Sequence, residues 1–131
     1  MAIGDVGRFT QIPYDEASFD CADLVVMVQR ELFGREIELP SQRPRGVQGQ
    51  AVIGRLSRSY ARRREGSPQD GDLVLMIDHG QRRPGHAGVF FFLAHEGWVL
   101  HTNEQNGCSV LHRTRELSGW GLRIEGYYEW I

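Results

Sequence analysis

The chain has 131 residues, a formal net charge of -2 and 15 basic residues, all of them arginine. This length suits one domain with a core of its own. An apolar fraction of 40% with so small a net charge excludes an intrinsically disordered protein. The charge balance gives no general attraction to nucleic acid or to anionic lipid. The absence of lysine excludes Schiff-base and P-loop lysine chemistry.

The first third of the chain carries the main helical pattern, SFDCADLVVMVQRELFG at residues 18–34. Ser18 or Asp20 can cap its start, because their side-chain oxygens accept hydrogen bonds from the first backbone N–H groups. Apolar residues recur every three or four positions, which predicts one buried stripe. Gly34 is suited to end the helix.

The segment from Ser41 to Asp70 is rich in arginine, glutamine, glycine, serine and proline. We interpret it as a polar, Arg-rich insertion within a single domain that spans residues 1–131, and not as a linker between two domains. A second, weaker helix is expected from Val47 to Arg63, although Gly49 and Gly54 weaken that pattern.

Strand patterns follow Pro68, where short β-branched and aromatic runs alternate with turn residues. Short turns favour an antiparallel meander. A helix followed by such strands indicates an α+β fold, with the N-terminal helix packed on an antiparallel sheet of about five strands. The expected strands are Asp72–Ile77, His86–Leu93, Gly97–Asn103, Cys108–Arg113 and Leu122–Ile131.

One cysteine and two histidines are placed where they could carry chemistry. Cys21 would occupy the second or third position of the helix, where unpaired N–H groups and the helix dipole favour a thiolate. His86 opens one strand and His101 lies near the end of the next, so antiparallel pairing puts both at one edge of the sheet. One imidazole can pair with the thiolate while the other orients it. A buried structural cysteine is the competing interpretation. No role is expected for the other histidines, which look like surface or turn residues: His79, His95 and His112.

Four motifs resemble, in order and spacing, those of the NlpC family of cell-wall cysteine peptidases (NlpC/P-sixty), a branch of the papain-like fold. FDCADLV is similar to the family's DCSGLV nucleophile motif, and GDLVLM is similar to its PGDLVFF strand. HAGVFF resembles HVGIYL, which begins with the catalytic histidine, and VLHTN resembles the IHAS segment, whose histidine orients the first. The resemblance runs from Ile12 to about Asn103, and the run IPY…FDC looks particularly like the small phage-tail members.

The resemblance implies hydrolysis of amide bonds in peptidoglycan stem peptides through a thioester, with no cofactor and no metal. Cys21 would be the nucleophile, His86 the general base and acid, and His101 the residue that orients His86. The backbone N–H of Cys21, with the side chain of Tyr14, would stabilise the oxyanion.

The substrate and the partners follow from the same resemblance. Stem peptides carry carboxylates, which arginine binds through two hydrogen bonds. Arg82 and Arg83 precede His86 and are candidates for that contact, with solvated turn residues as the simpler interpretation. Phage-tail or secretion-apparatus proteins are further expected partners, whereas a membrane or a nucleic acid is not expected. Because the N-terminus lacks the apolar segment of a Sec signal, we expect synthesis in the cytoplasm, with the virion or a non-Sec export route left open.

The chain departs from the family pattern beside the nucleophile, where Ala22 and Asp23 replace the usual Ser-Gly. The lost serine hydroxyl motivates an alternative function, a catalytically inactive structural or assembly module of a phage tail. Two weaker alternatives remain. The five arginines between Arg55 and Arg64 could bind a phosphate backbone. The cysteine and the two histidines could hold zinc, although no closely spaced ligand pair supports a metal site.

Overall fold

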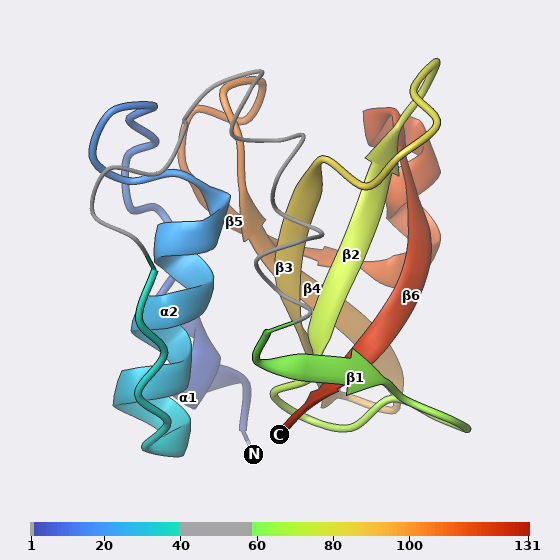
Figure 1. Ribbon diagram of the computed structural model, residues 1–131. Helices are drawn as coiled ribbons and strands as arrows, with labels where there is room; N and C mark the ends of the chain where they lie inside the picture. The colour runs from blue at the N-terminus through green and yellow to red at the C-terminus, as the bar shows by residue number, and fades with distance from the viewer. Residues whose placement is uncertain (1, 40–58) are drawn as a thin grey trace.

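The computed structural model describes residues 2–39 and 59–131, and it has the expected α+β architecture (Figure 1). Helix α2 packs against an antiparallel sheet of six strands in the order β1-β6-β2-β3-β4-β5. None of the described helices combines the length and apolar character needed to cross a membrane. The elements are α1 (Ile3–Gly7), α2 (Cys21–Phe33), β1 (Ala61–Arg63), β2 (Leu73–Asp78), β3 (His86–Leu93), β4 (Glu96–Thr102), β5 (Ser109–Arg113), the 3₁₀ helix η1 (Thr114–Trp120) and β6 (Leu122–Trp130).

The start of α2 is fixed by two aspartates that cap each other's backbone. Asp20 is the N-cap, and its Oδ1 accepts hydrogen bonds from the N–H groups of Ala22 at 3.0 Å and Asp23 at 3.1 Å. The Asp23 carboxylate in turn accepts from the Asp20 N–H at 2.9 Å. This reciprocal arrangement makes Cys21 the first residue of the helix, not the second or third as predicted. It also gives the departure from Ser-Gly a structural reason, because Asp23 serves as the second capping side chain.

The sheet confirms the strand predictions and extends them. Strands β2 to β5 form the predicted meander. The chain then leaves this order, because η1 carries it to β6, which pairs with β2 instead of β5. Ala61–Arg63 form β1 at the outer edge beside β6, so the sheet has six strands where about five were expected. The weak helix predicted over Val47–Arg63 is therefore wrong for its last residues, and residues 47–58 lie outside the described part of the chain.

Ion pairs explain why the arginine-rich end of the insertion forms a strand. The three consecutive arginines 62–64 all contact carboxylates on β6 or just before β2, so tertiary pairing outweighs the local helical pattern. Three of the five arginines noted above are thus used within the fold. The pairs are Arg62 with Glu129 at 2.7 Å, Arg63 with Glu125 at 2.7 Å and Arg64 with Asp72 at 2.9 Å.

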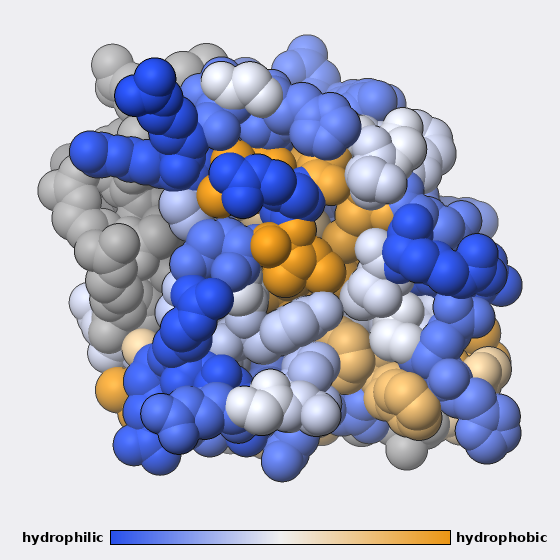
Figure 2. Space-filling model, turned by 90° about the vertical axis from the view of Figure 1, so that its right-hand side faces the viewer, coloured by the Kyte–Doolittle hydropathy of each residue, from blue (hydrophilic) through white to orange (hydrophobic). Residues whose placement is uncertain are grey.

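Each face of the sheet carries its own apolar cluster, and β3 contributes to both. On the α2 side, Phe91 stacks on Phe33 of the helix with ring centroids 6.1 Å apart. On the other side, Phe90 meets the ring of Tyr127 at 5.4 Å, and Leu117 of η1 covers the cluster. Figure 2 shows apolar residues reaching the surface amid polar ones on the side of the molecule where β6 and η1 lie. This alternation fixes the face to which each side chain of β3 points.

Gly88 lets β3 and β4 approach closely at the level of His101. A Cβ at Gly88 would lie 2.7 Å from Val99 Cγ1 and 2.8 Å from the Leu100 carbonyl oxygen, so backbone would have to move. We expect Gly88→Ala to lower the free energy of unfolding by about 1–3 kcal/mol, measured by urea denaturation. Gly119→Ala is the matched control, because nothing lies within 4 Å of its Cβ position. Equal stability of the two variants would contradict this reading.

Candidate functional site

Three imidazoles form a continuous hydrogen-bonded chain across β3, β4 and β5. Nε2 of His86 lies 2.8 Å from Nδ1 of His101, and Nε2 of His101 lies 3.0 Å from Nδ1 of His112. The outermost ring, His112, stacks on Trp120 of η1, with ring centroids 4.9 Å apart and an interplanar angle of 18°. The expected neighbourhood of His86 and His101 is confirmed, and a third histidine belongs to the same unit.

The strand register produces this chain. His101 of β4 is opposite Gly88 of β3 and Val110 of β5. His86 is two residues before Gly88 and His112 two residues after Val110, so both are diagonal neighbours of His101 on the same face. Diagonal side chains of this length can meet across a sheet. Since His112 stacks on Trp120, this shared face is the η1 side.

Burial keeps the inner rings uncharged. His86 is 4% exposed and His101 is fully buried. Desolvation lowers the pKa of His86 from 6.5 to about 4. Desolvation, followed by the charges of the neighbouring imidazoles, lowers the pKa of His101 well below its usual value. His112 is only partly buried, and its pKa is lowered by desolvation and partly restored by the negative charge of Glu116. At neutral pH, His86 and His101 are therefore neutral bases rather than cations.

Cys21 lies at the same end of the sheet as the first residue of β3. In Figure 1, α2 and β3 both start at the upper end of the molecule. The cysteine is 6% exposed and belongs to the α2-side core. Burial first, and then negative charge at Cys21, raise the pKa of the Tyr14 phenol. The backbone N–H of Tyr14 donates to the Gly107 carbonyl at 3.0 Å, which ties this segment to the turn before β5.

Cys21 and His86 belong to different faces of the sheet. Cys21 packs on the α2 side of the sheet, whereas the pleat directs His86 to the η1 side. Because Nε2 of His86 is engaged by His101, Nδ1 is the ring nitrogen left for the cysteine. The two groups can meet only around the end of β3.

The structure does not bring the other predicted site residues, Arg82 and Arg83, into contact with the histidine chain. Arg82 and Arg83 are exposed in the loop between β2 and β3, and no described carboxylate pairs with either of them. In Figure 1 this loop projects on the far side of the sheet end from the start of α2. No disulfide joins Cys21 to Cys108. The described residues contain no cluster of histidine, cysteine and carboxylate side chains arranged to hold a metal ion.

His112 is the residue that sequence reasoning missed, since it was expected to be a surface residue without a role. In the observed register His101 is opposite Val110, so His112, two residues further along β5, falls diagonal to it. The assignment needed the register, which a one-residue shift would have changed to the opposite face.

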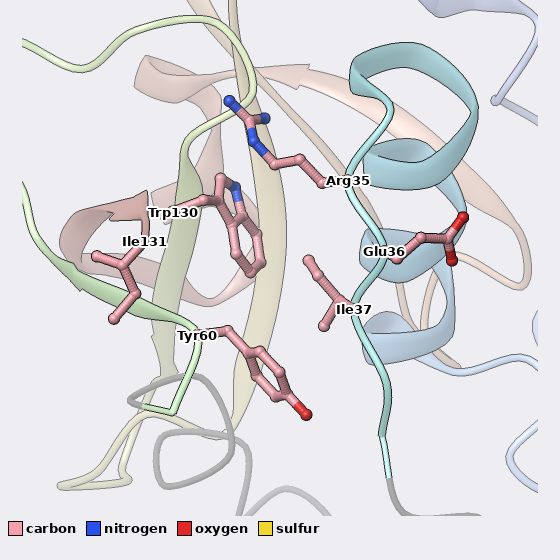
Figure 3. A pocket seen from close by; sticks show the side chains of 6 residues that line it. All are labelled: Arg35, Glu36, Ile37, Tyr60, Trp130 and Ile131. Atoms are coloured by element: carbon pink, nitrogen blue, oxygen red, sulfur yellow. The ribbon is translucent and has the colours of Figure 1, made fainter.

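A cavity of about 330 Å³ lies at the other end of the sheet. Figure 3 shows Ile37, Tyr60 and Trp130 pointing toward one another while the Glu36 carboxylate points away. Strand β6 passes Leu73, at the start of β2, before it reaches this cavity. His86 pairs with Met76, which lies near the other end of β2. The cavity is therefore far from the histidines. No cysteine or histidine lines it, and its residues are Arg35, Glu36, Ile37, Tyr60, Trp130 and Ile131.

The site assignment rests on the residues themselves. A buried chain of neutral imidazoles can take up and return a proton, and a cysteine at a helix start can act as a nucleophile. Comparisons of the chain with protein-family models, curated proteins and solved structures find no match.

Proposed function

We propose that this protein is a cysteine hydrolase of the NlpC type, which cleaves amide bonds in peptidoglycan stem peptides. The observation that carries the proposal is the histidine chain. His86 is buried, neutral and held through Nε2, and it lies at the sheet end where Cys21 begins α2. A base with one fixed nitrogen and one remaining nitrogen is what activation of a thiol requires.

The reaction begins from a neutral His86. As the Cys21 sulfur attacks the amide carbonyl, Nδ1 of His86 takes the thiol proton and the carbonyl oxygen becomes an oxyanion. The N–H at the start of α2 and the hydroxyl of Tyr14, which its raised pKa keeps protonated, donate to that oxyanion. His86 then gives its proton to the leaving amine, which leaves a thioester. Water attacks the thioester, with His86 accepting its proton, and the thiol is restored.

Stem peptides are the proposed substrate class because the motif likeness points to them. Their carboxylates suit arginine, and Arg82 and Arg83 are exposed near the start of β3 without a described ion-pair partner. The capping role of Asp23 supports a working site, because its carboxylate is directed to the Asp20 N–H. The replacement of Ser-Gly is thus compatible with a nucleophile at Cys21.

A catalytically inactive assembly module is the second candidate, and one observation favours it. Cys21 packs in the core on the α2 side of the sheet, whereas the pleat directs His86 to the η1 side. In such a module Cys21 would be a packing residue like its apolar neighbours in α2.

Thiol labelling separates the two candidates. Cys21 is buried and Cys108 is half-buried, so exposure alone predicts that iodoacetamide modifies Cys108 first. If His86 activates Cys21, Cys21 is expected to react faster than Cys108 at pH 7, by roughly tenfold or more, because His86 takes the thiol proton as the sulfur attacks the reagent. Peptide mass mapping over time measures both rates.

Two variants complete the labelling experiment. In the Cys108→Ser variant only Cys21 can react, so the labelling rate of Cys21 is measured alone. Adding His86→Gln to this variant is expected to slow the labelling of Cys21. Slow labelling of Cys21, unchanged in the His86→Gln variant, would support the inactive module and contradict the hydrolase.

A further inference from the structure

The three-histidine chain restricts where protons can sit. Each of its two hydrogen bonds needs one proton, and three neutral rings hold three protons in all. Two therefore occupy the bridges, and the third must be on one of the two end nitrogens, Nδ1 of His86 or Nε2 of His112. A proton on Nε2 of His112 leaves Nδ1 of His86 bare and basic. A proton on Nδ1 of His86 blocks it as a base.

The surroundings of His112 favour a proton at that end. Glu116 of η1 is the charged group that acts on His112 from its covering element, and its negative charge partly offsets the desolvation that lowers the pKa of His112. Glu116 is itself held as a carboxylate, since its Oε1 accepts the Arg113 backbone N–H at 2.8 Å and this bond lowers the pKa of Glu116. Trp120 stacks on the ring and keeps it in place.

We propose that His112 is a positioning residue, which, together with Glu116, holds the proton of the chain at its outer end and so keeps Nδ1 of His86 unprotonated. When Nδ1 of His86 takes up a proton, its Nε2 proton can shift to His101 and the His101 Nε2 proton to His112. Four protons then occupy both bridges and both ends, and the positive charge is shared among the rings. Return of the proton through Nδ1 of His86 reverses each shift.

The geometry gives His112 this role in preference to simple packing. A residue needed only to fill space on Trp120 would not have to place Nδ1 3.0 Å from His101. His112 is also the least buried ring of the three, so positive charge there costs less desolvation. The role in catalysis rests on the proposed function, but the proton arrangement does not.

Nitrogen NMR of histidine-labelled protein tests the proton arrangement without any activity. In the wild-type chain at pH 7.5, we expect the ¹⁵N shifts of His86 to show a protonated Nε2 and a bare Nδ1. His112→Phe keeps an aromatic ring beside Trp120 but removes the acceptor, so His86 should become a mixture of both tautomers. An unchanged His86 tautomer in this variant would overturn the proposal.

Glu116→Gln is the second variant, because glutamine can still accept the Arg113 N–H while the charge is lost. It is expected to move part of the population toward protonated Nδ1 of His86, and no shift in a folded Glu116→Gln protein would also overturn the proposal. Exposed His79→Gln is the matched control and should leave the His86 spectrum unchanged.

Kinetics then connect the arrangement to the reaction. If the hydrolase proposal is correct, His112→Phe should lower kcat roughly 10- to 100-fold with little change in KM, a smaller loss than removal of a general base brings. A normal kcat in a protein whose NMR shows the mixed tautomer would overturn the positioning role. Inactivity of the wild type, with the expected NMR result, would instead contradict only the proposed function.

Discussion

Replacing Cys21 by alanine is expected to lower the hydrolysis of peptidoglycan stem peptides by about 10⁴-fold or more, because the loss of a covalent nucleophile removes the whole thioester route. His86→Gln is expected to lower it to a similar extent. Residues that act as one unit give similar losses when either is removed, and the double variant should be no worse than the single ones. This near-equality is the signature of a working pair.

The measurement is the mass of the fragments released from purified peptidoglycan by the wild type and by each variant. Cys108→Ala is the matched control and should release the same fragments as the wild type, because Cys108 directly precedes β5, where it bridges to Pro13, and lies outside the proposed pair. Cleavage by Cys21→Ala at the wild-type rate would rule out the nucleophile. Cleavage by the wild type alone, with new termini identified by mass, would also define the bond.

Most of the fold follows from local signals in the sequence. The strand HAGVFFFL was predicted with both of its ends correct, because a turn precedes it and a short turn follows it. The end of α2 follows from Gly34, whose φ of +68° is a conformation that glycine adopts readily. These features depend on neighbouring residues in the chain.

The parts that sequence reasoning missed depend on distant partners. β1 forms because Ala61–Arg63 pair with the last residues of β6, so no local pattern predicts it. The same holds for His112, whose contact with His101 depends on a register between two strands. Cys21 illustrates a third case, since a motif predicts that it lies near the start of a helix but not the side of the sheet end on which it packs. Long-range pairing, rather than propensity, decides each of these.

The buried histidines also make the fold sensitive to acid, and the lowered pKa of His86 decides the direction in which the free energy of unfolding changes with pH. The folded protein protonates His86 near pH 4, whereas the unfolded chain does so near its ordinary value of 6.5. Between these values the unfolded state binds more protons, so the free energy of unfolding falls as the pH falls. The stabilisation is complete above about pH 7, and His86 alone should remove about 2 kcal/mol between pH 7.5 and pH 5. The lowered pKa of His101 acts in the same direction.

Urea denaturation at pH 7.5, 6.5, 5.5 and 5 measures this loss apart from that of the carboxylates. Glu96, Glu116 and Glu129 have a lowered pKa, so their stabilisation is lost mainly below their ordinary value of 4.5. His86→Gln should be less stable than the wild type at pH 7.5, because the packing of the buried imidazole ring is lost. Its stability should nevertheless change less than that of the wild type between pH 7.5 and pH 5. A variant whose stability falls in parallel with the wild type over this range would show that His86 is not the group responsible.

The same desolvation that costs stability in acid keeps His86 a neutral base at pH 7. A wild-type stability that does not change with pH would therefore also remove the physical basis for the proposed role of His86 in activating Cys21.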